Sequence, residues 1–253
     1  MPNNVQTFNQ FVEQYQPLWG DPARSYVFHR DDPRVNQKNV LAQRVQLSGL
    51  CYIHAPDMLQ HYLVSMNTPQ SAPMIDISRM IRERFTAIKL EKHIFEDAGD
   101  NAFLMLIYIL QHGSHILGAG IDQIEQRLRE YGPILISYFE VHEDFEAVDR
   151  CIYHGDHVGA LRGGHSMLII GVRIENNRKY FLLQNWWQRK QFIEVDGEYL
   201  ISCNAEFHYV RTPQLSIPNE FPTYFAIFAV NHLDKPVSHP TPPVGPIKGM
   251  FEF

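Results

Sequence analysis

Cysteine is scarce in this chain of 253 residues, and long apolar runs are absent. Three cysteines can form at most one disulfide, so the chain lacks the framework that is typical of small secreted proteins. The N-terminus has neither a basic flank nor an apolar run, so it is not a secretory signal. The apolar run at 103–110 is too short to span a bilayer. We therefore expect a cytoplasmic protein without a membrane partner.

A basic excess is absent as well. Lys and Arg total 22, against 28 for Asp and Glu, which leaves a formal charge of −6. Nucleic-acid-binding domains usually carry a net positive charge, so we expect no nucleic-acid partner. The same balance is compatible with a protein or peptide substrate.

The order of the predicted elements indicates an α+β fold. The spacing of apolar residues predicts helices from Asp76, over 101–111, and from Ile121 to Tyr131, where Gly132-Pro133 ends the last one. β-branched and aromatic residues then predict strands over 134–138, 166–174, 179–184, 198–202 and 223–229. The polar first 40 residues show only turn signals, at 20–22 and 31–33. Five prolines after residue 235 predict an extended tail over 236–253 that could bind a partner.

Motifs for nucleotides and metals are also missing. The glycines at 118–120 lack the third glycine of a dinucleotide site, and no phosphate-binding P-loop occurs. His142-Glu143 is not followed by a histidine at the metalloprotease spacing. Four nearby side chains could bind a metal, but a polar loop explains them better: His154, Asp156, His157 and His165. We expect no cofactor and no metal site.

Three segments together indicate nucleophilic catalysis. Cys51 follows a Ser48-Gly49 turn and opens an expected helix in VQLSGLCYIHAP. His165 follows two glycines in RGGHSMLIIGV, and Asn185 ends the next predicted strand in YFLLQNWW. A helix N-terminus and an imidazole both favour a thiolate, so Cys51 and His165 could rest as an ion pair. An asparagine amide can hold such an imidazole in the required tautomer.

Each of these residues alone is a weak signal. A lone cysteine is more often a small buried hydrophobic residue, and a lone histidine after two glycines is usually a loop residue. An asparagine before two tryptophans could equally form a turn. The order Cys, His, Asn, with strands at the expected places, favours catalysis over these readings.

With these segments the chain resembles the papain-like cysteine peptidases, the cathepsin family. GGHSMLIIGV is similar to the family's histidine motif, LLQNWW to its Asn-x-Trp motif, and LREYGPILISYFEVHEDF to its Gly-Pro strand segment. The resemblance is nearly continuous over about 120–202 and patchier over 43–60 and 98–115. It implies a two-lobed peptidase domain over 1–235, with a helical lobe over about 40–118 and a β-rich lobe over about 119–235. The active site would lie in the cleft between them.

The resemblance also implies roles for single residues. Cys51 would be the nucleophile, His165 the acid and base, and Asn185 the residue that orients the imidazole. Gln46 would donate to the oxyanion, together with a main-chain N–H. Gly99 would pair with the extended substrate.

Two further residues, Gly164 and Trp187, would complete the substrate-binding surface. Trp187 would also shield the bond between the histidine and the asparagine from water. Some positions depart from the family pattern. Gln46 lies five residues before Cys51, one fewer than usual, and only Ala98-Gly99 stands where a glycine pair is expected.

Alternatives to peptide or isopeptide hydrolysis remain open at this stage. The same triad could carry out acyl transfer or side-chain deamidation, since only the leaving amine or the deacylating nucleophile differs. A catalytically dead papain-like module that binds a partner is a further alternative. Because 50 residues precede Cys51, we expect no conventional inhibitory pro-segment.

Overall fold

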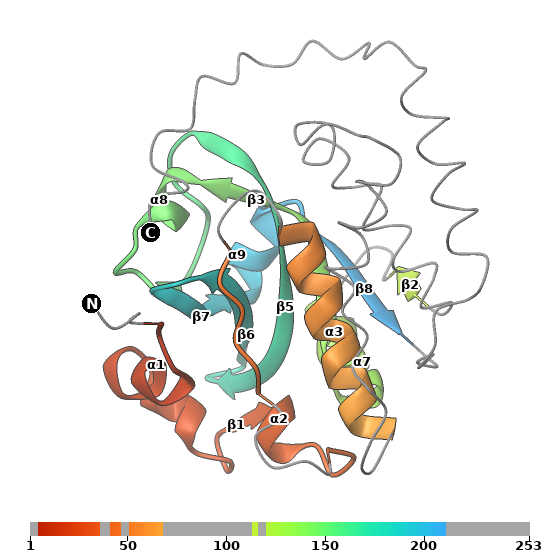
Figure 1. Cartoon of the computed structure of the whole chain (residues 1–253). Coiled ribbons are helices and arrows are strands. Elements are labelled where there is room, and N and C mark those ends of the chain that lie inside the picture. The colour runs from red at the N-terminus through yellow and green to blue at the C-terminus, as the bar shows by residue number, and fades with distance from the viewer. Residues whose placement is uncertain (1–4, 36–40, 47–50, 68–112, 116–119, 211–253) are drawn as a thin grey trace, which may run out of the picture.

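The computed structural model describes residues 5–35, 41–46, 51–67, 113–115 and 120–210. These residues form an eight-stranded sheet in the order β2-β8-β3-β5-β6-β7-β4, with β1 joined to β5 (Figure 1). The strands are β1 (Ser25–Val27), β2 (Gly113–His115), β3 (Ile134–His142), β4 (Ile152–Tyr153), β5 (Leu161–Glu175), β6 (Arg178–Trp187), β7 (Lys190–Asp196) and β8 (Glu206–Val210). The helices are α1 (Phe8–Gln14), the 3-10 helix η1 (Pro17–Gly20), α2 (Phe28–Asp31), α3 (Cys51–Asn67), α7 (Ile121–Tyr131), α8 (Glu143–Glu146) and α9 (Gly197–Ser202).

Several predicted features lie outside the described residues. They are the helix from Asp76, the helix over 101–111, Gly99, the strand over 223–229 and the tail over 236–253. The division into lobes near residue 118 and the domain end at 235 therefore stay predictions. Among the described residues, no helix is both long and apolar enough to cross a bilayer.

The long strand β5 lies at the centre of the sheet. Its first part pairs with β3 and its second part with β6 and β1, all antiparallel. Because side chains alternate along a strand, its apolar residues divide between two faces. Leu168 and Ile170 pack in one core cluster, and Met167 and Ile169 pack in the other.

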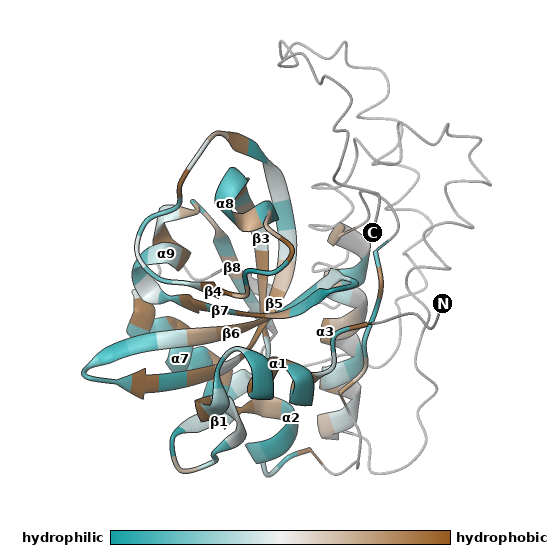
Figure 2. Cartoon of the chain, turned by 90° about the vertical axis from the view of Figure 1, so that its left-hand side faces the viewer, coloured by the Kyte–Doolittle hydropathy of each residue, from teal (hydrophilic) through white to brown (hydrophobic). Residues whose placement is uncertain are grey.

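Helices cover both faces of this sheet. The first cluster contains Trp19 and Tyr62, from η1 and α3. The second contains Leu128, Phe145 and Tyr199, from α7, α8 and α9. In Figure 2, α1 and α2 are largely coloured hydrophilic, as expected for helices whose outer sides face solvent. The two clusters bury side chains from segments far apart in the sequence and so hold the sheet in place.

The N-terminal segment contains elements that the turn signals did not predict. α1 begins with a capping box in which Thr7 and Gln10 exchange hydrogen bonds of 3.2 and 2.8 Å. Its Phe11 is fully buried, and β1 adds to β5 with Tyr26 opposite Val172. Few apolar side chains, widely spaced, thus suffice to anchor this polar segment to the sheet.

The helix expected at Cys51 is confirmed, because α3 begins at that residue. It continues through Pro56, where the missing N–H removes one main-chain hydrogen bond. Ala55, Leu59 and Tyr62 are buried on the side that packs against β5 and β3. This packing explains why the helix tolerates an internal proline.

The helix over 121–131 is confirmed as α7, and Gly132 ends it with a φ of 95°, which favours glycine. The strand predicted over 198–202 is wrong, because these residues form α9. The Asp196 side chain caps α9 by accepting the main-chain N–H of Tyr199 at 2.8 Å. The apolar residues of this segment are buried on one helical side instead of alternating across a sheet. β7, directly before α9, was not predicted.

Candidate active site

His165 and Asn185 lie on neighbouring strands, β5 and β6, and their side chains meet. Nε2 of His165 is 2.7 Å from Oδ1 of Asn185, and both side chains are buried. The Asn185 amide nitrogen donates to the main-chain oxygen of Lys190 at 2.9 Å. A carbonyl oxygen can only accept, so this bond turns Oδ1 toward the imidazole. His165 must then carry its proton on Nε2, which leaves Nδ1 as the acceptor of a second proton.

Burial sets the charge state of this imidazole. Desolvation lowers the pKa of His165 to about 4, the bond to Asn185 opposes this shift, and the positive charge of Lys190 adds to it. Near neutral pH His165 is therefore a neutral base in the tautomer described above. An ion pair with Cys51 would require the thiolate charge to overcome this desolvation, and it stays a prediction.

Two consecutive tryptophans directly after Asn185 pack on opposite faces of the sheet. The Trp187 ring packs against the His165 ring, with centroids 5.2 Å apart, and joins the second core cluster. Trp186 joins the first cluster, and its Nε1 donates to the main-chain oxygen of Ser166 at 2.7 Å. Trp187 is only 7% exposed, so it limits the access of water to the His165 ring.

Cys51 lies at the first residue of α3 and is half-buried against the first core cluster. One turn further along, the His54 ring is 6.2 Å from the Trp186 ring. The beginning of α3 therefore lies beside the end of β6, directly after Asn185. Figure 1 shows α3 running along β5. At this position the helix dipole favours a negatively charged sulfur.

Gln46 also lies beside the end of β6. Its main-chain N–H donates to the main-chain oxygen of Trp186 at 2.7 Å. Its side-chain Oε1 is buried and has no hydrogen-bond partner among the described residues. Glutamines of the sheet hold the segment before it: Gln184 donates to the oxygen of Ala42 at 2.7 Å, and Gln191 to that of Arg44 at 2.8 Å. The segment over 41–46 is thus fixed against β6 and β7.

Gly164 precedes His165 in β5 and lies opposite Glu140 of β3. A Cβ built on it would come no closer than 4.0 Å to the Tyr138 Cα, so packing does not demand glycine here. Tyr138 lies in a bulge of β3 with a φ of 55°, and 37% of it is exposed. The sequence analysis did not identify this exposed aromatic residue near Gly164, because a bulge leaves no signal in the sequence pattern.

The second residue that the sequence analysis missed is Lys190, which begins β7 after the short Gln188-Arg189 turn. Its main-chain oxygen orients Asn185, and its side chain is buried. A lysine after a turn is normally exposed, so its pattern predicts nothing unusual.

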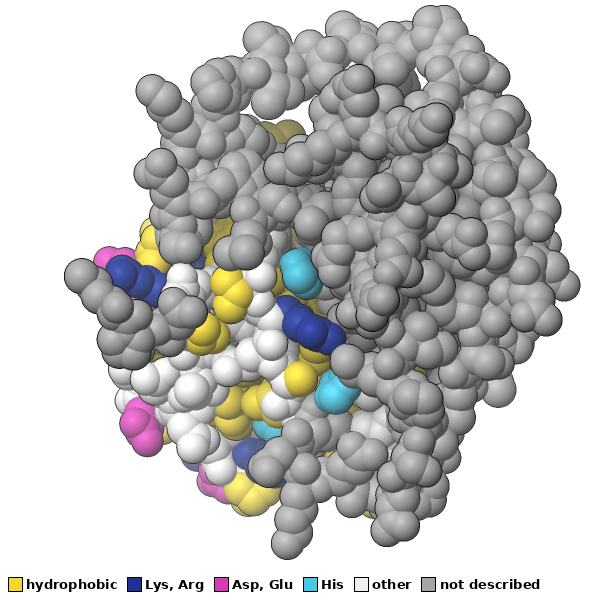
Figure 3. Space-filling view, in the orientation of Figure 1, with side chains coloured by type: hydrophobic (Ala, Val, Ile, Leu, Met, Phe, Trp, Pro, Cys, Tyr) yellow, Lys and Arg dark blue, Asp and Glu magenta, His cyan; other side chains and the backbone are white. Residues whose placement is uncertain are grey.

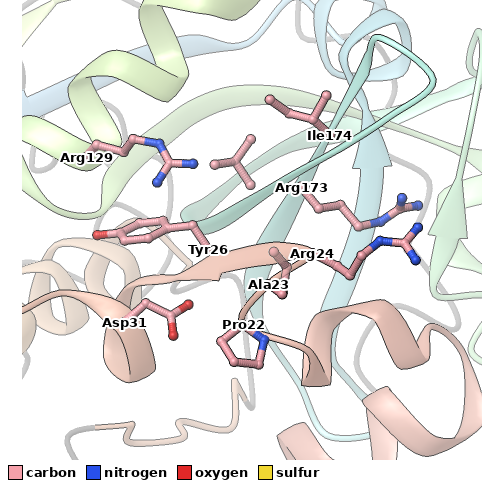
Figure 4. Close-up of a pocket in the computed structure, with 10 residues that line it drawn as sticks. Pro22, Ala23, Arg24, Tyr26, Asp31, Arg129, Arg173 and Ile174 are labelled. Carbon is pink, nitrogen blue, oxygen red and sulfur yellow. The ribbon is translucent and has the colours of Figure 1, made fainter.

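A separate cavity of about 470 Å³ lies at the β1–β5 edge, and Figure 4 shows its lining residues. Arg24, Arg129 and Arg173 line it, but each already pairs with a glutamate, at 3.6, 2.9 and 2.7 Å. Paired guanidinium groups leave little charge for a ligand, so we assign no function to this cavity.

On the described part of the face shown in Figure 3, histidine and basic side chains lie among apolar ones. Over the described ranges, however, no group of three or more His, Cys, Asp or Glu side chains could hold a metal ion. His142 and His157 stack at 3.6 Å between ring centroids instead of converging on a common point.

Comparisons with known proteins point to one family. Residues 108–205 match the family described as "Papain family cysteine protease". Cathepsin B-like cysteine proteinase 3 of Caenorhabditis elegans is 39% identical over 67 residues, which are 26% of this chain and 18% of that protein. Cathepsin B-like cysteine proteinase 2 of Haemonchus contortus is 34% identical over 74 residues, 29% of this chain and 21% of that protein.

A solved structure shares the fold. It comes from the work "Structural basis for the limited antibody cross reactivity between the mite allergens Blo t 1 and Der p 1". It superposes with a TM-score of 0.54 at 11% identity, over 74% of this chain and 70% of that one. The resemblance to the papain-like cysteine peptidases and the α+β papain-like fold are thus confirmed. The chain matches only about a fifth of the curated relatives' length.

Proposed function

We propose that this papain-like chain is a cysteine peptidase that hydrolyses peptide or isopeptide bonds of protein or peptide substrates through a thioester on Cys51. The observation that carries the proposal is the bond between His165 and Asn185. It presents Nδ1 of a neutral imidazole as a general base, the state that a thiol nucleophile requires for activation.

In the acylation step, Nδ1 of His165 takes the proton of the Cys51 thiol. The sulfur then attacks the carbonyl carbon of the scissile bond, and the carbonyl oxygen becomes negatively charged. The main-chain N–H of Cys51 and the side-chain amide of Gln46 would stabilise this oxyanion. His165 then gives its proton to the leaving nitrogen, the C–N bond breaks, and the acyl group remains on Cys51 as a thioester.

Deacylation repeats these proton transfers with water. His165 takes a proton from the water molecule, whose oxygen attacks the thioester carbon. When the C–S bond breaks, the sulfur recovers its proton and the carboxylic acid leaves. Asn185 keeps the imidazole in one orientation through both steps. We further propose that a reducing compartment, such as the cytoplasm, keeps the thiol active, since none of the three cysteines forms a disulfide in the structure.

The proposal is tested by alkylation with iodoacetamide and by exposure to a peptide mixture. We expect Cys51 to react faster than a free cysteine, and Cys51→Ala to lose all cleavage. Cys203→Ala is the matched control, because this thiol is fully buried and burial raises its pKa to about 12. Ordinary Cys51 reactivity together with unchanged cleavage in Cys51→Ala would contradict the proposal. Hydrolysed side-chain amides without new N-termini would show deamidation instead.

A further inference from the structure

Lys190 holds a buried charge beside the active site. The residue is 1% exposed, and in the part of the chain that the structure describes no carboxylate forms an ion pair with it. Its Nζ donates instead to the main-chain oxygens of Phe145 and Ala147, the latter at 3.1 Å, and to the hydroxyl of Tyr153. An ammonium group has three donors, and these three acceptors satisfy all of them.

Aromatic rings enclose the same ammonium group. Nζ lies 4.4 Å from the centre of the Phe145 ring, 4.7 Å from that of Tyr153 and 5.7 Å from that of Trp187. The negative faces of aromatic rings attract a cation at these distances. The Lys190 side chain therefore links α8 and β4 to the β6–β7 turn, which Lys190 directly follows.

Two contacts connect Lys190 and its turn to the His165–Asn185 pair. The main-chain oxygen of Lys190 accepts the amide N–H of Asn185 at 2.9 Å, which points Oδ1 at His165. Trp187, which pairs with Lys190 across the turn, packs on the His165 ring. Any shift of the turn would move both the residue that orients the imidazole and the ring that covers it.

We propose that Lys190 is a positioning residue of the active site: its ammonium group, clamped by Phe145, Ala147 and Tyr153, holds the turn that orients Asn185 and His165. The inference rests on the proposed function. A methionine of similar length could fill this space without burying a charge, so packing alone does not explain a lysine here.

The electrostatic surroundings agree with this role. Burial lowers the pKa of Lys190 to about 7, which shows that its charge is poorly compensated. The charge also makes the imidazolium form of His165 less favourable. The other titratable or charged groups that face Lys190 are Asp144, Asp149, Arg150, Cys151 and Tyr153.

The test measures the alkylation rate of Cys51 by iodoacetamide from about pH 3 to about pH 8 in Lys190→Met. We expect the rate constant to fall about tenfold, because the imidazole loses its fixed orientation. We also expect the acid limb of the profile, which reports protonation of His165, to move up by about half a pH unit, because a positive charge near His165 is gone. A purely structural residue would not move this limb. Lys190→Arg, which keeps the charge, should bring the limb back toward the wild-type position.

Tyr153→Phe removes one acceptor of the clamp and keeps the ring, so it decides the question if Lys190→Met fails to fold. We expect it to slow alkylation about threefold or more. Tyr199→Phe is the matched control, since its hydroxyl lies in the same aromatic cluster but faces Asp144 at 3.4 Å. It should leave rate and profile unchanged. A folded Lys190→Met with the wild-type profile, or Tyr153→Phe with the wild-type rate, would overturn the proposal.

NMR of the His165 ring nitrogens in a Cys51→Ala background separates this inference from the proposed function. The tautomer and pKa of His165 can be measured there without any catalysis. We expect Lys190→Met to raise the pKa of His165 and to reduce the population with the proton on Nε2. If Cys51 proves unreactive but these signals change, the proposed function fails and the role of Lys190 stands. If the signals stay the same, Lys190 does not position His165.

Discussion

Two buried polar clusters cross the same strands of the sheet, and they are built in opposite ways. The histidine cluster of the candidate active site consists of His165 on β5, Asn185 on β6 and Lys190 on β7. The ion-pair cluster consists of Arg173 on β5 and Glu194 on β7, with Trp19 and His154 bonded to the same glutamate. Both clusters lie among apolar side chains, so the main difference between them is whether their charged groups have partners of opposite charge.

In the ion-pair cluster every charge meets its opposite. Arg173 binds Glu194 through two parallel hydrogen bonds of 2.7 and 2.8 Å, and it also binds Glu175 at 2.8 Å. Desolvation alone would lower the pKa of Arg173, but the bonds to Glu194 outweigh it and the pKa is raised. Arg173 therefore keeps its charge, and the cluster joins β5, β7 and η1.

In the histidine cluster, no described carboxylate forms an ion pair with His165 or Lys190, although Asp144 and Asp149 act on Lys190 electrostatically. Burial lowers the pKa of His165 to about 4 and that of Lys190 to about 7, so both groups shift toward their neutral forms. A base whose charged form is unfavourable can accept a proton and release it again during a reaction. Within one sheet, therefore, buried groups of opposite charge that pair with each other link strands rigidly. A buried basic side chain without such a partner instead becomes a group that can lose and gain a proton.

The largest effect should follow from breaking the ion pair. Glu194→Gln leaves the buried Arg173 with the part-exposed Glu175 as its remaining carboxylate partner, and we expect the free energy of unfolding to fall by about 3–5 kcal/mol. Urea unfolding measures this loss. Glu175→Gln is the control, since that carboxylate is 35% exposed and its removal should cost less than about 1 kcal/mol. Equal losses in both variants would contradict the distinction between the clusters.

Gln46→Ala should affect the reaction and not the fold. Gln46 Oε1 lacks a partner among the described residues, whereas both oxygens of Glu194 are bonded. If the amide serves the oxyanion, kcat should fall by roughly 10²–10³, about 3–4 kcal/mol, with KM little changed. Steady-state kinetics on a cleaved peptide measures this. A rise in KM at constant kcat would assign Gln46 to substrate binding instead.

Asn185→Ala removes the link between His165 and Lys190. We expect the alkylation rate of Cys51 to fall by about 10², because the imidazole then samples both tautomers. The free energy of unfolding should fall by about 1–3 kcal/mol, since the main-chain oxygen of Lys190 loses its buried donor. Rate and stability are measured on the same preparation. An unchanged rate would show that Asn185 does not orient His165.

Acid should destabilise the fold, because two of its buried histidines are neutral. Burial lowers the pKa of His165 and of His29 to about 4, from 6.5 in the unfolded chain. Between pH 6.5 and 4 the unfolded chain binds more protons, so stability is full above pH 6.5 and falls toward pH 4. Urea unfolding across this range should show the decline, and His29→Leu should make it shallower. A free energy of unfolding that stays constant between pH 6.5 and 4 would contradict the low pKa values of these two histidines.

The sequence predicted the parts of this protein whose signals are local. The helix start at Cys51, the end of α7 at Gly132 and the strands around His165 all follow from short patterns. α9 was predicted as a strand because its apolar residues are dense. The cap at Asp196, together with burial on one side, decides for a helix. Gly99 and the tail lie outside the described residues, so those predictions stay open.

By itself, the sequence determined which reactive groups this protein has: a thiol, an imidazole and an amide in papain-like order. It also determined that the chain has too few cysteines for a disulfide framework. Only the tertiary structure decided the protonation of that imidazole. The proton on Nε2 of His165 depends on a carbonyl of Lys190, and the position of Lys190 depends on acceptors at Phe145, Ala147 and Tyr153. These partners lie 37 to 45 residues away along the chain. Hydrogen bonding and desolvation act over a few ångströms in space, so no pattern along the sequence can reveal them.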